Sequence, residues 1–267
     1  MTEKAEEKQY RCPGESYTIS DSVCRGRQRV NYPKCNVCLE KVEPGGFAQS
    51  HAEPKLSINI FMSYDIRGKY LSELNDTTAH KIGTSIALFF REKNPDVKNI
   101  VVGRDMRLSS KSLANALIEG LCTAGLNVIN VGVVSSEMTY FAVGHYKYDG
   151  GVMVTASHNP AEYNGFKLCR EQAIPVSFET GIDRISKLTK QYHPLRGEHL
   201  GKVIVSDIFA DYKKHVLKFA SNLRHLRVVI DAGNGMAGKT IPLVCEGLPI
   251  EIIPLYFELD GSFPNHE

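Results

Sequence analysis

From about residue 56 onward, short apolar runs alternate with longer segments whose apolar residues recur at helical spacing. The runs at 100–103 and 150–154 consist of small and β-branched residues and are typical of buried strands. The segments at 109–124 and 137–146 show the periodicity of helices that bury one face. This alternation predicts an α/β fold, with strands paired into a sheet and helices packed against it.

Further elements follow the same pattern. A helix capped by Asp76 and ending before Pro95 is expected to bury four apolar side chains: Ile82, Ile86, Phe89 and Phe90. A later helical stripe consists of four more: Phe178, Ile182, Ile185 and Leu188. The remaining expected elements are strands at 56–64, 127–131, 203–205, 227–231 and 250–255, and a helix at 208–223.

These elements divide the chain into three expected parts. Residues 1–55 contain few aliphatic residues and form a small Cys-rich module, whereas residues 56–205 form an α/β domain. Residues 206–267 begin a second α/β domain with only two clear strands, which is too little sheet to bury a helix pair well. We therefore expect the second domain to be truncated in this chain.

Charge and hydropathy limit the classes of partner. Lys and Arg number 32 against 30 Asp and Glu, so a net charge of +2 provides no general field for nucleic acid or an anionic membrane. The charged N-terminus lacks the apolar region of a secretion signal, and no apolar run approaches the ~18 residues of a spanning helix. The sequence predicts a cytoplasmic protein that binds neither nucleic acid nor membranes; it does not predict an oligomeric state.

The run at 150–154 leads directly into a loop that is rich in polar side chains. Ser157, His158 and Asn159 follow the strand, and the proline after Asn159 forces a turn at the strand end, where α/β proteins bind ligands. With Asn164 and Lys167, the segment concentrates donors suited to an oxyanion, and Lys167 could also transfer a proton. The alternative is a turn whose Ser and Asn satisfy local backbone groups. A Ser-His-Asp triad is disfavoured, since no Gly-x-Ser-x-Gly elbow surrounds the serine.

Four of the seven cysteines lie in the N-terminal module, and they are Cys12, Cys24, Cys35 and Cys38. Cys35 and Cys38 form a C-x-x-C knuckle that could share one structural Zn²⁺ with the other two; four free thiols are the alternative. Bound zinc would supply the folding energy that this core-poor segment lacks. The cysteines at 122, 169 and 245 lie in apolar elements and are expected in the core.

The segment 233–240 fits the phosphate-binding pattern G-x-x-x-x-G-K-[ST] and follows an expected strand. Only 27 residues follow Thr240, which is too few for the rest of a nucleotide-binding sheet. We therefore interpret this segment as a tight turn between a strand and a helix, and a P-loop nucleotide-binding protein is a remote alternative.

Four segments, taken together and in this order, resemble the α-D-phosphohexomutases, especially the phosphomannomutase/phosphoglucomutase branch. The most specific is Thr155-Ala156-Ser157-His158-Asn159-Pro160 with Tyr163-Asn164-Gly165-Phe166-Lys167, which resembles the active-site loop of that family. The others are Tyr64-Asp65-Ile66-Arg67-Gly68 and the runs at 102–109 and 229–235. The resemblance covers residues 57–267 and implies a phosphohexomutase-type mixed-sheet domain followed by part of a second α/β domain.

The resemblance implies an isomerase of carbohydrate metabolism that interconverts hexose 1-phosphate and hexose 6-phosphate. Ser157 would carry the phosphoryl group and exchange it with the sugar through a hexose 1,6-bisphosphate. Lys167 and Arg67 would neutralise the phosphoryl charge and contact substrate, with Lys167 as general acid and base. His158 would hydrogen-bond near the reacting oxygens, Tyr64 would line the substrate side, and Mg²⁺ would bind the Ser157 phosphate.

Compared with the family pattern, we expect this chain to lack the Asp-rich metal loop and the later sugar-reading and phosphate-clamping domains. Turnover by the chain alone is therefore expected to be weak. The alternative function is a non-catalytic, zinc-bearing module that binds a sugar phosphate. The charged residues Arg104, Asp105 and Arg107 are interpreted as a structural network rather than as part of the site.

Overall fold

The structure is a computed structural model that describes residues 9–10, 19–20, 58–194 and 200–265. The chain divides into two compact units, residues 1–53 and 54–267. In the first unit, β1 (Gln9–Tyr10) and β2 (Ile19–Ser20) form an antiparallel pair. The four cysteines of the predicted zinc site lie outside the described residues, so the zinc site stays a prediction.

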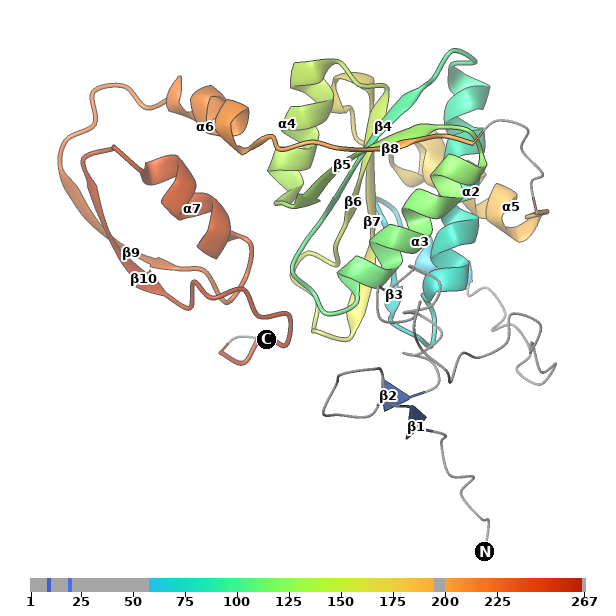
Figure 1. Cartoon of the computed structure of the whole chain (residues 1–267), viewed down its shortest axis with the longest axis horizontal. Coiled ribbons are helices and arrows are strands. Elements are labelled where there is room, and N and C mark those ends of the chain that lie inside the picture. The colour runs from blue at the N-terminus through green and yellow to red at the C-terminus, as the bar shows by residue number, and fades with distance from the viewer. Residues whose placement is uncertain (1–8, 11–18, 21–57, 195–199, 266–267) are drawn as a thin grey trace, which may run out of the picture. The chain divides into compact units, whose positions relative to one another are not determined.

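The second unit is built on a six-stranded mixed sheet with the order β3-β7-β6-β4-β5-β8 (Figure 1). Its strands are β3 (Ile66–Lys69), β4 (Asn99–Arg104), β5 (Asn127–Val133), β6 (Gly150–Val154), β7 (Tyr163–Arg170) and β8 (Val203–Val205). The strands from β6 to β8 in this order are parallel, whereas β7 runs antiparallel to both β6 and β3. The predicted mixed-sheet α/β domain is therefore confirmed.

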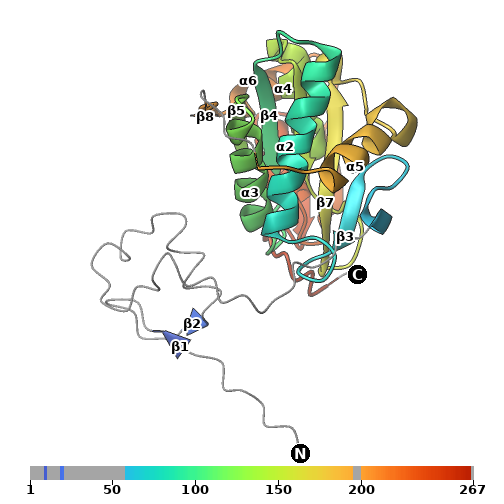
Figure 2. The same cartoon turned by 90° about the vertical axis from the view of Figure 1, so that its right-hand side faces the viewer.

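Helices cover both faces of this sheet. The helices are α2 (Asp76–Lys93), α3 (Ser110–Thr123), α4 (Ser136–Tyr146) and α5 (Asp183–Lys190). Helices α2 and α3 lie on one face and α4 on the other (Figure 2). Alternate residues of one strand point to opposite faces, so Val102 packs in the core with α2 and α3, while Val101 packs in a second core with α4. The sheet is thus buried on both sides, as its continuous apolar strands predict.

The start of the domain differs from the sequence prediction. No strand extends through the described part of 56–64; Ile58–Ile60 form the short helix η2, and Phe61 makes an isolated bridge to Ile66. The backbone N–H of Met62 donates to the carbonyl of Asp65 at 2.8 Å, so the chain reverses direction here and the first strand begins at Ile66. Apolar residues before this reversal reach the core without joining the sheet.

Three other boundaries also differ. Helix α2 is capped by Asn75 instead of Asp76, because the Asn75 side chain accepts a hydrogen bond from the Thr78 N–H at 2.9 Å. The stripe from Phe178 to Leu188 is divided between the π-helical turn η4 (Phe178–Ile182) and α5, since Gly181 has non-helical dihedrals. The antiparallel strand β7 was not predicted, because its polar start was interpreted as loop.

The C-terminal part is a smaller α/β unit. It contains α6 (Phe209–Leu217), β9 (Leu226–Asp231), α7 (Ala237–Cys245) and β10 (Ile250–Leu255). The two strands are parallel, with Leu226 opposite Ile250, and both were predicted; the helix α6 ends six residues before the predicted end. Among the described residues, none of the helices has the length and apolar character needed to cross a membrane.

Candidate active site

The loop from Thr155 to Glu162, between β6 and β7, carries Ser157 in a left-handed backbone conformation. Its φ angle is 58°, which costs a non-glycine residue about 1 kcal/mol or more. Two hydrogen bonds hold the turn: the Ser157 N–H donates to Thr155 Oγ1 at 2.9 Å, and the Asn159 N–H donates to the Ala156 carbonyl at 3.1 Å. This loop, which we call the serine loop, therefore presents an exposed Ser157 side chain at the end of a buried strand.

A cleft of about 900 Å³ opens beside the serine loop and brings together all five residues predicted for catalysis and substrate binding. These residues are Tyr64, Arg67, Ser157, His158 and Lys167. The rest of the wall is largely apolar and includes Phe61, Met62, Tyr140, Pro175 and Phe178. An apolar wall with a few convergent polar groups is the usual composition of a small-molecule site.

Two basic side chains reach this cleft from neighbouring strands. Arg67 lies on β3 opposite Gly165 of β7, and Lys167 follows two residues later on β7. Because Ile66 and Phe166 point into the core beside α2, strand alternation directs Arg67 and Lys167 to the other face of the sheet, the face that α4 covers. The sheet register therefore places two positive charges on the same side.

The two cations are held differently. Arg67 Nη1 donates to Asn159 Oδ1 at 2.8 Å and Nη2 pairs with the Asp65 carboxylate, so Arg67 ties β3 to the serine loop. Within residues 58–194 and 200–265, Lys167 and His158 make no side-chain hydrogen bond or ion pair. Lys167 is half-buried and His158 is exposed. Both side chains are therefore available to a ligand in the cleft.

Asn164 was expected to contribute its amide to the cleft, and this expectation is wrong. The Asn164 side chain is fully buried; its Nδ2 donates to Ser109 Oγ at 2.8 Å and to Ser110 Oγ at 2.9 Å. Its Oδ1 accepts from the Gly165 N–H at 2.8 Å. The amide thus joins β7 to the start of α3. It does not reach the cleft because the even-numbered residues of β7, including Asn164, point to the face of the sheet opposite the one that carries Lys167.

The predicted charge network at the end of β4 is present. Arg107 Nε faces Asp105 Oδ2 at 3.3 Å, and Asp105 Oδ1 accepts from the Arg107 N–H at 3.0 Å and from Ser110 Oγ. Arg104 Nη1 donates to the Asp105 carbonyl at 3.2 Å. Burial lowers the pKa of both arginines, and the Asp105 charge opposes this shift. The sequence did not indicate that Arg107 also contacts the serine loop.

Comparison with known proteins agrees with this geometry. Residues 59–195 match the family model for phosphoglucomutase/phosphomannomutase alpha/beta/alpha domain I, and residues 209–267 match the model for domain II. The chain belongs to the phosphoglucomutase/phosphomannomutase family.

Individual relatives match this chain over only part of their own length. It is 39% identical over 215 residues to a phosphomannomutase of Vibrio cholerae, covering 78% of this chain and 46% of that protein. It is 40% identical over 212 residues to phosphohexose mutases of Xanthomonas campestris, covering 79% and 46%. A solved phosphoglucomutase/phosphomannomutase family protein from Burkholderia thailandensis superposes with a TM-score of 0.71 at 32% identity, covering 79% and 47%. The chain therefore spans about half the length of the relatives it matches.

Within this chain, the P-loop-like segment consists of the turn after β9 and the first residues of α7, which begins at Ala237. Its lysine, Lys239, donates to the Val133 carbonyl at 2.8 Å and lies 4.3 Å from the ring centroid of Phe209. A phosphate-binding loop needs this ammonium group free for the nucleotide. The interpretation as a tight turn between strand and helix is therefore supported, and the nucleotide-binding alternative is not.

A metal site would need several oxygen, nitrogen or sulfur ligands close together. In the part of the chain that the structure describes, no group of three or more His, Cys, Asp or Glu side chains is placed to hold a metal ion. The described side chains around Ser157 are instead mostly cationic or neutral, and the carboxylate among them, Asp65, is paired with Arg67. Such a set suits a phosphate better than a divalent cation.

Proposed function

We propose that this chain contributes the phosphoserine part of a phosphohexomutase site. The reaction would interconvert hexose 1-phosphate and hexose 6-phosphate through a phosphorylated Ser157 and a hexose 1,6-bisphosphate. The observation that carries the proposal is one cleft in which an exposed serine, on a left-handed turn, meets Arg67, Lys167 and His158. Family membership supports the same function, as does the similarity to a phosphomannomutase and to phosphohexose mutases.

The transfer itself can be written with residues of this cleft. A sugar hydroxyl attacks the phosphorus of phosphorylated Ser157, the new bond from sugar oxygen to phosphorus forms, and the bond from Ser157 Oγ to phosphorus breaks. Lys167 accepts the hydroxyl proton and returns it to the departing Ser157 Oγ, so the serine regains its hydroxyl and Lys167 its starting state. After the bisphosphate reorients, its other phosphoryl group returns to Ser157 Oγ, and the serine proton passes to the departing sugar oxygen through Lys167.

The charges of the cleft match the needs of this transfer. A phosphorylated serine carries a charge of about −1.5 to −2 near neutral pH and has three acceptor oxygens. Arg67 provides fixed positive charge, protonated Lys167 adds to it, and His158 would provide a hydrogen bond near the reacting oxygens. Tyr64, with 80% of its surface exposed, would contact the sugar on the open side of the cleft.

Mg²⁺ is the metal that the family generally uses, and it would neutralise the same phosphoryl group. The phosphate oxygens on Ser157 would be its ligands from this region. The described residues supply no carboxylate cluster, so the steps above rely only on side chains of this chain.

The proposal is tested by incubating the chain with hexose 1,6-bisphosphate that carries ³²P and measuring label on the protein. We expect label on the native chain and none on Ser157→Ala. The matched control is Ser63→Ala, which removes another hydroxyl from the wall of the same cleft and should keep the label. Binding of the bisphosphate with no transfer of label would instead identify a non-catalytic sugar-phosphate module, and label that survives Ser157→Ala would refute the assignment of Ser157.

A further inference from the structure

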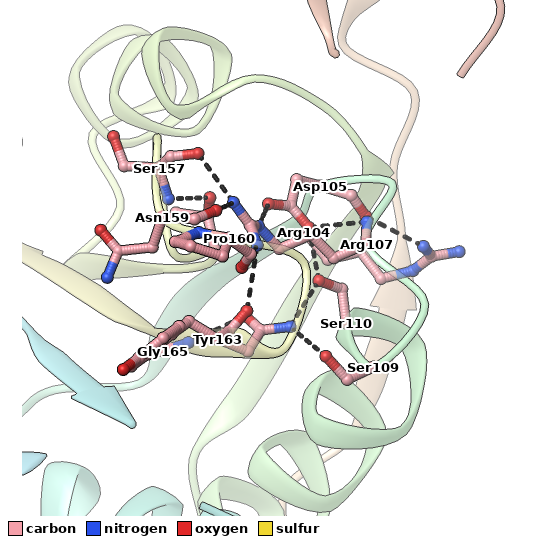
Figure 3. Close-up of polar contacts among 12 residues, drawn as sticks. Arg104, Asp105, Arg107, Ser109, Ser110, Ser157, Asn159, Pro160, Tyr163 and Gly165 are labelled. Atoms are coloured by element: carbon pink, nitrogen blue, oxygen red, sulfur yellow. Dashed lines mark hydrogen bonds and ion pairs between the residues drawn. The ribbon is translucent and has the colours of Figure 1, made fainter. Parts of the chain in front are cut away.

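The Arg107 guanidinium contacts the serine loop although it does not line the cleft. Its Nη2 donates to the carbonyls of Ser157 at 3.0 Å and Asn159 at 2.6 Å, and its Nη1 donates to those of Pro160 at 2.8 Å and Tyr163 at 3.1 Å. In Figure 3 the Ser157 carbonyl is turned toward this guanidinium, whereas the Ser157 side-chain oxygen points away from it. A single side chain thus binds four carbonyls, three in the serine loop and that of Tyr163 at the start of β7.

Arginine is the side chain suited to this arrangement. A planar guanidinium has five N–H donors in a rigid fork, whereas lysine has a single ammonium group on a flexible stem. Arg107 is 2% exposed, its Nε faces the Asp105 carboxylate at 3.3 Å, and the Phe263 ring lies over it at 4.8 Å. The guanidinium is therefore enclosed and held by its neighbours before any ligand binds.

We propose that Arg107 is a positioning residue for phosphoryl transfer, because it holds the serine loop in the one conformation that presents Ser157 to the cleft. This proposal rests on the function proposed for Ser157. A left-handed serine persists only where its surroundings hold it, and the four bonds to Arg107 provide that restraint. They also direct four partly negative carbonyl oxygens toward a cation and away from a phosphoryl dianion on the Ser157 side chain.

The test compares three variants with the native chain. Arg107→Ala removes all the donors, and Arg107→Lys keeps the charge without the fork. The matched control is Arg104→Ala, since Arg104 is three residues earlier and its described hydrogen bond goes only to the Asp105 carbonyl. Two quantities are measured: amide hydrogen exchange of the peptide covering 155–163, with α2 as an internal reference for folding, and the rate of ³²P transfer to Ser157.

In Arg107→Ala we expect exchange in 155–163 to rise about tenfold or more while α2 stays protected, and labelling of Ser157 to slow by about tenfold to a hundredfold. Arg107→Lys should show the same changes in smaller degree, and millimolar guanidinium should restore part of the labelling rate in Arg107→Ala. Arg104→Ala should resemble the native chain in both measurements. If Arg107→Ala does not fold, Arg107→Lys carries the test.

Two results would overturn the proposal: unchanged exchange in 155–163 on loss of the Arg107 fork, or a labelling rate within about twofold of native. Failure of the proposed function gives a different result, namely no label on the native chain. In that case the restraint on the loop is still judged by hydrogen exchange, which does not depend on activity.

Discussion

Replacing Asn164 by alanine tests whether this amide acts in the core or in the cleft. The substitution removes three hydrogen bonds, two from Nδ2 to Ser109 and Ser110 and one from the Gly165 N–H to Oδ1. Each such bond contributes about 1 kcal/mol net, so the free energy of unfolding should fall by about 3 kcal/mol. Complete burial of the side chain means that water cannot replace the lost partners without entering the core.

The free energy of unfolding can be measured by urea denaturation followed by far-ultraviolet circular dichroism, since the chain contains no Trp to report fluorescence. With an m-value of about 2 kcal/mol per molar urea, a loss of 3 kcal/mol lowers the midpoint by about 1.5 M. The matched control is Asn159→Ala, which removes an amide that lines the cleft and accepts one hydrogen bond from Arg67. Its cost should be about 1 kcal/mol or less.

The reasoning is refuted if Asn164→Ala costs no more stability than Asn159→Ala. Such a result would mean that the buried amide is not joining β7 to the start of α3. The expectation from the sequence, an amide that serves a ligand in the cleft, would then be favoured again.

Three other predictions follow from local geometry. Gly165→Ala should lower the free energy of unfolding by about 3 kcal/mol or more, or prevent folding, because the new Cβ would lie 2.0 Å from the Ile66 carbonyl oxygen. Its control is Gly144→Ala in α4, where no atom lies within 4 Å of the added Cβ, and this change should raise the free energy of unfolding by about 0.5–1 kcal/mol. Urea midpoints would show both effects. Ser157→Gly should be more stable than Ser157→Ala by about 1 kcal/mol at φ 58°, with neither accepting ³²P, and equal stabilities would argue against the left-handed turn. Burial raises the pKa of Tyr140 from 10.0 to about 12, so the contribution of this residue to stability is complete below pH 10 and is lost as the pH rises toward 12. Tyr140→Phe should reduce this loss of stability at high pH, measured as urea midpoints. A pH profile identical to that of the native chain would contradict the shift.

Local sequence patterns predicted much of the second unit correctly. The strands β4, β6, β9 and β10 and the helices α3 and α4 match their predicted positions to within a few residues. These elements have strong apolar patterns, and in β4, β6, α3 and α4 the apolar residues face a core on one or both sides. Periodicity records which face of an element is apolar, so it is informative wherever burial follows that simple pattern.

The prediction was incomplete where polar residues are buried. Strand β7 contains Asn164, Gly165 and Lys167, which lower β-propensity and resemble a loop. It nevertheless lies between β3 and β6 in the sheet, where pairing on both sides satisfies its backbone. Only the fold places Ser109 and Ser110 beside Asn164, across more than 50 positions of sequence, so the role of that amide could not be read locally.

The sequence by itself determined which groups are available for chemistry: a serine at a strand end, an imidazole beside it, and an amine ten residues further on. The tertiary structure decided which of these groups meet and which are enclosed. Arg67 reaches Asn159 across 92 residues because β3 and β7 are neighbours, and Arg107 reaches the Ser157 carbonyl across 50 residues because β4 and β6 are neighbours. The physical reason is that strand pairing brings distant segments within hydrogen-bonding distance, and local periodicity carries no information about which strands pair.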